Sequence, residues 1–342
     1  MSTTDQKLKL LHLAQILETE TDDDHGLTGP QLIERLAERG VEVERKTLYR
    51  DIACLVEFGY DIQKYQRNPV EYGLATRDFQ GPELLLLADA VQSSKFLTER
   101  KAASLVKSIG KLGSRHMADD LRRRIHVEGR IKSQNESVFY NIDAIQRAMA
   151  AKRKVSYRYF KLDERKRRVM QHGGERYLET PVQLVYMGDA YYLVTWNDKH
   201  EGFANYRVDR MVNIEVSDEP ATHNKRVAEF DVGKYQERTF GMFNGESVGV
   251  TLLVQASAMS AVVDRFGKDV LATPAGDGAA RVGATVMLSP TFYGWLAQFG
   301  DEVVIESPAR VREAYVGYLK GIVEAYGESG PRVKRLRATD EG

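Results

Sequence analysis

The chain has 342 residues, and its 49 Lys and Arg balance 49 Asp and Glu, so the formal net charge is zero. This length predicts two or three domains rather than one small core. There is no apolar run of about 20 residues, as a membrane span needs, and MSTTDQKLKL lacks the apolar stretch of a secretory signal, so we expect a cytoplasmic protein. The single cysteine, Cys54, excludes an internal disulfide framework. Because it lies between Ile52 and Leu55 in a helical pattern, we expect it to pack in a core.

Charge is unevenly distributed along the chain. Residues 1–75 contain nine Lys and Arg and fourteen Asp and Glu, residues 100–132 contain ten and three, and residues 152–168 contain nine and two. The two basic stretches suit a polyanionic partner. A solvated helix face is the simpler interpretation of either stretch alone.

Residues 1–76 predict a winged helix-turn-helix. LKLLHLAQIL has the apolar spacing of one helix, and TGPQ begins a second, with Thr28 and Gln31 at the spacing of a capping box. A third helix, ERKTLYRDIACLVEF, ends before Gly59. DIQKY and VEYGL then predict two short strands around a turn at Asn68-Pro69.

The third of these helices is the predicted recognition helix. The N-terminal end of such a helix meets base edges and phosphates in the major groove. Arginine can pair with guanine, while Lys, Thr and Tyr can hold phosphate. With the hairpin as a wing, the residues predicted to bind DNA are Arg45, Lys46, Thr47, Tyr49, Arg50, Lys64 and Arg67. The acidic total of the segment favours a module that binds only proteins, whereas the basic face of the helix favours DNA.

Residues 77–150 predict a helical linker. Its helical segments are GPELLLLADAVQSSKFL, TERKAASLVKSIGKL, DDLRRRIHVE and NIDAIQRAMAAKRK. Helices between a DNA-binding head and a sensor commonly form a dimer contact. We therefore expect this segment to form a bundle that contributes to a homodimer and binds no ligand.

The hydrophobic period changes from helical to alternating over residues 151–220. KVSYRYF, RYLETPVQLVY, AYYLVTWND and FANYRVDRMVNIEV each predict a strand, which gives a small all-β, barrel-like domain. After a linker over residues 221–245, strands and helices alternate over residues 246–328 and predict an α+β domain of ferredoxin-like arrangement. Residues 329–342 form a polar tail. The whole chain is thus predicted to be a multidomain α+β protein.

The sequence contains no motif that requires catalysis. Its seven histidines show no H-x-x-x-H pairing, and the P-loop, G-x-S-x-G and G-x-G-x-x-G motifs are absent. A structural zinc site is not expected without cysteine partners. Paired carboxylates such as Asp163-Glu164 lie in charged runs that water solvates. We expect no enzyme, no metal and no cofactor.

The β-domain resembles the WYL domain of bacterial transcriptional regulators. That family is named for a Trp-Tyr-Leu triplet, followed by a strand of the form Arg-x-aromatic-Arg-apolar-Asp-Arg. Here the triplet is Tyr191-Tyr192-Leu193, and the later strand is ANYRVDRM, with Ala204 in the place of the leading arginine. The head, the helical linker and the C-terminal extension follow the same domain order.

The resemblance implies a homodimeric regulator whose WYL domain senses a ligand, often a nucleotide or a nucleic-acid fragment. Arginine offers a rigid fork for phosphate, and tyrosine offers a stacking face. Strand alternation would place Asn205, Arg207 and Asp209 on one face. The predicted anion site consists of Ser156, Arg158, Tyr192, Asn205 and Arg207, with Asp209 and Arg210 as supporting residues. The alternative is that Asp209 pairs with Arg207 or Arg210 only as structural support.

Two interpretations of the function follow. The first is a ligand-responsive transcriptional regulator whose heads bind a double-stranded operator with two half-sites. The second is a protein that binds RNA or single-stranded nucleic acid through the basic stretches 100–132 and 152–168. Binding of duplex DNA by residues 1–76 alone would favour the first.

Overall fold

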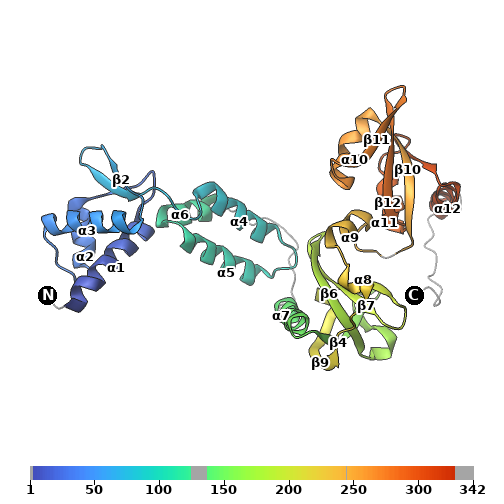
Figure 1. Cartoon of the computed structure of the whole chain (residues 1–342), viewed down its shortest axis with the longest axis horizontal. Coiled ribbons are helices and arrows are strands. Elements are labelled where there is room, and N and C mark those ends of the chain that lie inside the picture. The colour runs from blue at the N-terminus through green and yellow to red at the C-terminus, as the bar shows by residue number, and fades with distance from the viewer. Residues whose placement is uncertain (1–2, 125–136, 244, 328–342) are drawn as a thin grey trace. The chain divides into compact units, whose positions relative to one another are not determined.

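The computed structural model describes residues 3–124, 137–243 and 245–327, which fall into two compact units (Figure 1). The first unit, up to residue 136, contains the head and a helical arm. The second, from residue 137, contains a β-domain, a connecting segment (residues 221–245) and an α+β domain. In these ranges no helix combines the length and the apolar character needed to cross a membrane.

The head has the helix–helix–helix–hairpin order of a winged helix-turn-helix. Its elements are α1 (Thr3–Glu20), β1 (Leu27–Thr28), α2 (Gly29–Ala37), α3 (Arg45–Phe58), β2 (Ile62–Tyr65) and β3 (Glu71–Leu74). The three strands form an antiparallel sheet of order β1-β3-β2. Thr28 and Gln31 form the predicted capping box, and α3 ends at Gly59, whose φ of 119° suits glycine.

One side of α3 is buried in the core of the head. Its buried residues are Leu48, Asp51, Ile52 and Leu55. Cys54 is exposed, so the prediction that it packs in a core is wrong. The inward-facing Asp51 instead forms an ion pair with Lys9 of α1, at 2.7 Å and with side chains 10% and 8% exposed. This pair joins α3, the predicted recognition helix, to α1.

The helical arm follows the head. It consists of α4 (Gly81–Ser93), α5 (Glu99–Ile109), the short helix η1 (Gly110–Leu112) and α6 (Arg115–Arg124). Figure 1 shows α4 beside both α5 and α6. Its buried core is small and comprises Leu84, Ala88 and Leu121, with Leu85, Val106, Ile109 and Met117 packed against them.

The arm is joined to the head through side chains at the start of α6. Ser114 Oγ donates to Asp22 Oδ2 at 2.5 Å, Arg115 pairs with Glu20 at 3.1 Å, and the rings of His25 and His116 stack at 4.0 Å. Ser114 and Asp22 are both buried. Burial opposes ionisation of Asp22, but hydrogen bonds from Ser114 and His25 outweigh it and lower its pKa. These contacts hold the arm and the head together as one body.

The β-domain is a curled antiparallel sheet with one helix. Its elements are α7 (Ser137–Ala150), β4 (Arg153–Leu162), β5 (Arg168–Met170), η2 (Gln171–Gly174), β6 (Tyr177–Met187), β7 (Ala190–Asn197), β8 (Gly202–Arg207), η3 (Val208–Arg210) and β9 (Met211–Pro220). The strand order is β5-β4-β6-β7-β8, and β9 pairs with β4. The last strand thus returns beside the first, as in a small barrel, and α7 packs against β4, β6 and β9.

The segment FANYRVDRMVNIEV forms two strands, not the single strand predicted. β8 ends at Arg207, and residues 208–210 turn as η3 before β9 begins at Met211. The Asn141 side chain of α7 donates to the carbonyls of Val208 and Met211, both at 3.0 Å. These bonds hold the turn, so the predicted alternation of side chains stops at Arg207.

The α+β domain has the predicted ferredoxin-like arrangement. Its elements are β10 (Ser247–Gln255), η4 (Ala256–Ala258), α10 (Met259–Phe266), β11 (Leu271–Gly276), β12 (Ala279–Met287), α11 (Pro290–Ala297), β13 (Val303–Ser307) and α12 (Ala309–Ala325). The antiparallel sheet has the order β11-β12-β10-β13. The edge strand β11 departs from the predicted alternation of strands and helices, because β12 follows it directly. It is mostly exposed and contains Pro274, so it has no apolar alternation that would predict a strand. The predicted tail over residues 329–342 lies outside the described residues.

The connecting segment contains α8 (Lys225–Ala228) and α9 (Val232–Arg238), and it contacts both neighbouring domains. On the β-domain side, Tyr235 and Met242 are buried against Val185 and Val194. On the other side, residues of the α+β domain bind its backbone: Thr291 Oγ1 donates to the Phe240 carbonyl at 2.6 Å, and Arg265 Nη2 donates to the Thr239 carbonyl at 2.9 Å. The segment is therefore packed structure rather than a free tether.

Candidate nucleic-acid interface and anion site

The outer face of α3 carries cations near its N-terminal end. Arg45, Lys46 and Arg50 are exposed, and Thr47 is half-buried. Within the described part of the chain, the Lys46 and Arg50 side chains form no hydrogen bond or ion pair. Because neither cation is neutralised by an acidic neighbour, both are available to phosphates or base edges.

Tyr49 connects the recognition helix to the wing and to α2. Its hydroxyl accepts a hydrogen bond from Arg45 Nε at 2.9 Å. Its ring centroid lies 5.9 Å from that of Tyr72 on β3, and a Cβ on Gly29 would come within 3.2 Å of its hydroxyl. Tyr49 therefore positions Arg45 and packs against the wing and the start of α2.

The two predicted wing contacts differ in their environments. Lys64 on β2 is exposed and has no side-chain partner among the described residues. Arg67 forms an ion pair with Glu71 at 2.7 Å and lies over the ring of Tyr65 at 5.1 Å. Lys64 is therefore the more available of the two for a phosphate.

In the β-domain, Tyr192, Asn205 and Arg207 lie on one face of neighbouring strands. Tyr192 on β7 lies directly opposite Arg207 on β8, and Val194 lies opposite Asn205. Val194, Tyr192 and the residues beside them face the connecting segment. The structure thus brings together three of the five residues predicted for the anion site.

The Arg207 guanidinium is held by Asp209. Its Nε and Nη2 donate to Asp209 Oδ1 and Oδ2 at 3.0 and 2.8 Å. The two side chains are 34% and 28% exposed. The Asp209 carboxylate raises the pKa of Arg207. This bidentate pair orients the guanidinium and leaves Nη1 for an anion.

Ser156 and Arg158 are not beside this cluster. Both lie on β4, where they alternate with the buried Tyr157 and Tyr159, so their side chains leave the opposite side of the strand. The Ser156 hydroxyl accepts a hydrogen bond from Arg176 Nε at 2.7 Å. Arg158 is exposed. The β4 residue that reaches Arg207 is instead Tyr159, whose hydroxyl accepts from the Arg207 backbone N–H at 3.2 Å.

The Asn205 side chain is occupied by the connecting segment. Its Nδ2 donates to the Met242 carbonyl at 2.9 Å, and its Oδ1 accepts from the Tyr235 hydroxyl at 3.0 Å. Burial raises the pKa of Tyr235 to about 12. Asn205 therefore links the strand of Arg207 to the connecting segment instead of offering its amide to a ligand.

A buried polar cluster lies on the inner face of the same sheet. Its aromatic members are Tyr157, Tyr159, Tyr177 and Tyr206, with ring centroids 5.3 to 6.2 Å apart. Glu179 beside them is 4% exposed, and burial raises its pKa to about 7. Its Oε1 accepts from Asn197 Nδ2 at 2.8 Å, while its Oε2 is buried without a hydrogen bond from the described residues. The alternating tyrosines of VSYRYF were the sequence signal for this cluster.

Comparison with known proteins identifies the two domains of the second unit. The WYL domain family matches residues 140–216, and the WCX domain family matches residues 246–323. The chain is a WYL-domain protein. The WYL match begins inside α7, and the WCX match covers most of the α+β domain, hereafter the WCX domain.

Two solved structures show weaker similarity. Proteasome accessory factor B/C (PafBC) of Arthrobacter aurescens is 18% identical with a TM-score of 0.28, and the similarity covers 99% of this chain and 49% of that chain. The chain thus spans about half the length of PafBC. A CRISPR Cas-related protein is 15% identical with a TM-score of 0.35, covering 72% and 71% of the two chains. No curated protein matched the chain.

Two further positions of the WYL domain differ in their role from Arg207. Ala204, in the place of the leading arginine, lies opposite Thr195 and leaves no cation there. Arg210 lies by the hydroxyl of Tyr159: burial raises the pKa of that hydroxyl, and Arg210 and the Arg207 backbone N–H moderate the rise. Arg210 therefore interacts with the tyrosine cluster, and its predicted support of the anion site stays a prediction.

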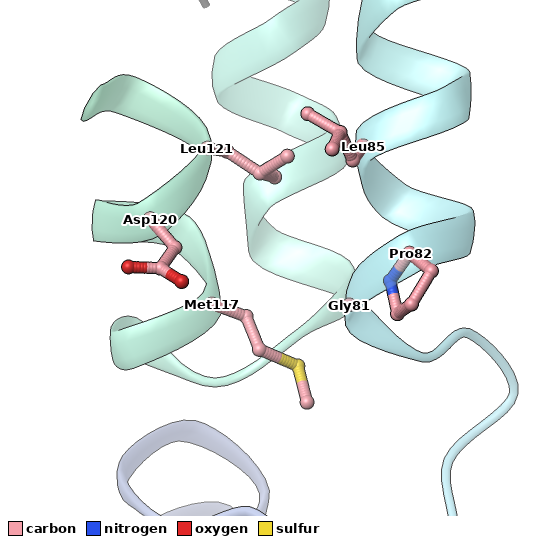
Figure 2. Close-up of a pocket in the computed structure, with 6 residues that line it drawn as sticks. All are labelled: Gly81, Pro82, Leu85, Met117, Asp120 and Leu121. Atoms are coloured by element: carbon pink, nitrogen blue, oxygen red, sulfur yellow. The ribbon is translucent and has the colours of Figure 1, made fainter. Parts of the chain in front are cut away.

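A hollow of about 280 Å³ lies in the helical arm, between α4 and α6. It is lined by Gly81, Pro82, Leu85, Met117, Asp120 and Leu121. Figure 2 shows Leu85 and Leu121 pointing towards each other across it. Its one charged lining residue is the acidic Asp120, and none of the residues predicted for DNA or ligand lines it. The hollow therefore does not suit an anion.

Proposed function

We propose that this WYL-domain protein is a DNA-binding transcriptional regulator. The presence of a WYL and a WCX domain behind a winged helix-turn-helix head supports a regulator. The observation that carries the proposal is the basic face of α3, where Lys46 and Arg50 are exposed and unpaired within the described residues. The buried Lys9–Asp51 pair keeps this helix rigidly in place. A fixed helix with free cations is suited to the major groove.

We propose further that the WYL domain binds an anionic ligand, a nucleotide or a nucleic-acid fragment, at Tyr192 and Arg207. Support comes from the guanidinium that Asp209 orients and from the tyrosine directly opposite it. A guanidinium can grip phosphate while a tyrosine ring stacks on a base. Ser156 and Arg158 have no part in this smaller site. Binding would change operator affinity by favouring one placement of the heads over another.

The proposed regulator is a cytoplasmic bacterial homodimer that acts by binding rather than by catalysis. The arm supports self-association, because α4 has leucines around its whole circumference but buries only part of it. Leu84 is fully buried, whereas Leu86 is 70% exposed. A leucine left exposed beside a buried one on the same helix turn suits a further apolar partner. A second copy of α4 would cover Leu86 and would bring two heads into one assembly.

The alternative function, binding of RNA or single strands, has less support at residues 152–168. Lys154 pairs with Asp198 and Glu219, and Arg167 pairs with Asp163. With the pair of Arg165 and Glu164, three of the nine cations in this stretch have a carboxylate partner, which lowers its positive charge without removing it. The structure describes the other basic stretch, residues 100–132, as far as residue 124, and this part includes most of α5.

Selection of binding sites from a random duplex library by the full chain tests the DNA-binding proposal. We expect the enriched sequences to contain two inverted half-sites, about one helical turn or a multiple of it apart. If no duplex is retained while single strands of the same library are, the alternative function replaces the proposal.

Calorimetric titration with a panel of nucleotides and short oligonucleotides tests the ligand proposal. We expect the wild-type chain and an Arg158→Ala control to bind the same member of the panel, and Arg207→Ala to lose at least tenfold in affinity. Operator binding without ligand should be equal in all three. Equal ligand binding by Arg207→Ala would place the site elsewhere.

A further inference from the structure

The head alone offers few free cations to a duplex. Residues 1–75 contain nine Lys and Arg against fourteen Asp and Glu. Several of the nine are already neutralised, because Lys9 pairs with Asp51, Arg35 and Arg39 pair with Glu20, and Arg67 pairs with Glu71. Affinity for a duplex depends mainly on how many phosphates a protein neutralises. A regulator with this head therefore needs positive charge from outside it.

The outer face of α5 and η1 supplies such charge. Arg100, Ser104, Lys107 and Lys111 follow one another at i, i+4, i+7 and i+11, and all four are exposed. This spacing places them in one row along the helix, over a length of about 16 Å. Among the described residues, the three cations have no hydrogen bond or ion pair. The row is therefore an uncompensated positive strip.

The opposite side of the same helix packs into the arm. Ala102 is buried, and Val106 and Ile109 pack against the core of α4 and α6. The amphipathic pattern fixes which face is outward. Because Ser114, Arg115 and His116 of the arm are bound to the head, the strip is held in a set position relative to α3. Free cations at a fixed distance from a recognition helix can contact the same duplex.

We infer that the strip of Arg100, Ser104, Lys107 and Lys111 is a second DNA contact, which grips the phosphate backbone beside the half-site bound by α3. The inference rests on the proposed function. The composition of the strip decides the kind of partner: it has cations and a hydroxyl, which suit phosphates, and no aromatic ring on which a single-stranded base could stack. It also has no large apolar side chain for a protein partner. The contact adds affinity without reading sequence.

The salt dependence of duplex binding tests this inference. The variant is Arg100→Gln with Lys107→Gln and Lys111→Gln, since glutamine keeps helix propensity and removes charge. Dissociation constants for the operator and for a scrambled duplex are measured with the full chain at several salt concentrations. We expect the slope of log K against log salt to lose about 2.7 in magnitude, about 0.9 for each phosphate contact removed. The ratio of operator to scrambled affinity should not change.

The matched control is Arg122→Gln with Arg123→Gln on α6. Both arginines are exposed in the same unit, but they pair with Asp119 and Asp120. We expect the wild-type slope for this control. A wild-type slope for the triple variant overturns the α5 contact while the proposed function stands. A wild-type chain that binds no duplex overturns both, and a triple variant weakened only towards single strands shows that the strip serves single-stranded nucleic acid instead.

Discussion

Helix α3 and strand β8 each carry an arginine for which we propose an anionic partner, but the two arginines differ in their surroundings. On α3, Arg50 and Lys46 project from a rigid helix and have no partner within the described residues. On β8, Arg207 is gripped by Asp209, and Asn205 is bound to the connecting segment. Flexible cationic side chains can contact the long phosphate backbone of DNA. A small anion is bound better by a guanidinium whose orientation is already fixed. This contrast is the one expected if α3 binds DNA and β8 binds a small ligand, as we propose.

The largest expected effect on stability is at the buried ion pair between Lys9 of α1 and Asp51 of α3. Replacing Asp51 with Asn leaves Lys9 buried without its counter-charge, which should destabilise the head by about 3 to 5 kcal/mol. Hydrogen exchange of the full chain should show faster exchange in α1 and α3 and unchanged exchange in the WYL strands. Glu57→Gln, an exposed change on the same helix, is the control. Unchanged protection in α1 would mean that α3 is not held by this pair.

The next effect concerns Glu179 in the tyrosine cluster and depends on pH. Its pKa is about 7 when folded against 4.5 for the ordinary group, so the folded protein keeps a proton that the unfolded chain loses. Stability should therefore fall as pH rises from 4.5 to 7, by about 3 kcal/mol in total. Glu179→Gln should remove this loss and be the more stable protein above pH 7.

Urea unfolding followed by tryptophan fluorescence at pH 5 and pH 8 measures this difference, since Trp196 lies on β7 of the same sheet. The exposed Glu175→Gln serves as the control and should follow the wild type. The free energy of unfolding could instead change by the same amount in the wild type and in Glu179→Gln between the two pH values. The inner face of the WYL sheet would then be more hydrated than its burial implies.

A smaller loss is expected where the WYL sheet meets the connecting segment. Asn205→Ala leaves the Tyr235 hydroxyl and the Met242 carbonyl without their partner, which should cost about 1 to 3 kcal/mol. Tyr235→Phe removes only one of the two bonds and should cost about 1 kcal/mol. The double variant in a thermodynamic cycle measures the coupling. If the losses in free energy of unfolding of the two single variants simply add in the double variant, Asn205 does not bind Tyr235 of α9 in solution.

The smallest effect on the free energy of unfolding is expected at Arg50, on the exposed face of α3. Arg50→Ala should change the free energy of unfolding by less than about 0.5 kcal/mol. It should nevertheless weaken operator binding by about 1 to 3 kcal/mol, which is roughly 5- to 150-fold. Fluorescence anisotropy with a labelled operator measures the affinity, and Arg122→Ala on α6 is the control. Equal binding by Arg50→Ala would remove α3 from the DNA interface.

Features set by neighbouring residues could be predicted from the sequence. The Thr28–Gln31 capping box and the end of α3 at Gly59 follow local rules, and both are present. Tyr192 and Arg207 could be assigned to one predicted site from their motifs, whereas their direct opposition across β7 and β8 comes from the structure. Cys54 was misplaced because one position is a 100° turn around a helix, which is enough to pass from core to surface.

Features set by distant residues could not be predicted. β8 ends at Arg207 because Asn141 of α7, far away in sequence, binds the backbone of the following turn. The grouping of Ser156 with Arg207 assumed that two motifs on separate strands converge, but Ser156 lies on the other side of β4 from Tyr159 and is bound by Arg176. Tyr159 reaches Arg207 only because the curled sheet returns β9 to the side of β4. No alternation within a single strand encodes these contacts.

The packed connecting segment has a consequence for how the chain can be divided or recombined. A WYL domain cut after Pro220 would lose Tyr235 and Met242 and expose Val185 and Val194 to water. A WCX domain that keeps the segment would carry the same apolar surface with nothing to cover it. Modular exchange between related regulators should therefore succeed when residues 137–327 are transplanted as one piece, and fail when the join falls between 221 and 245.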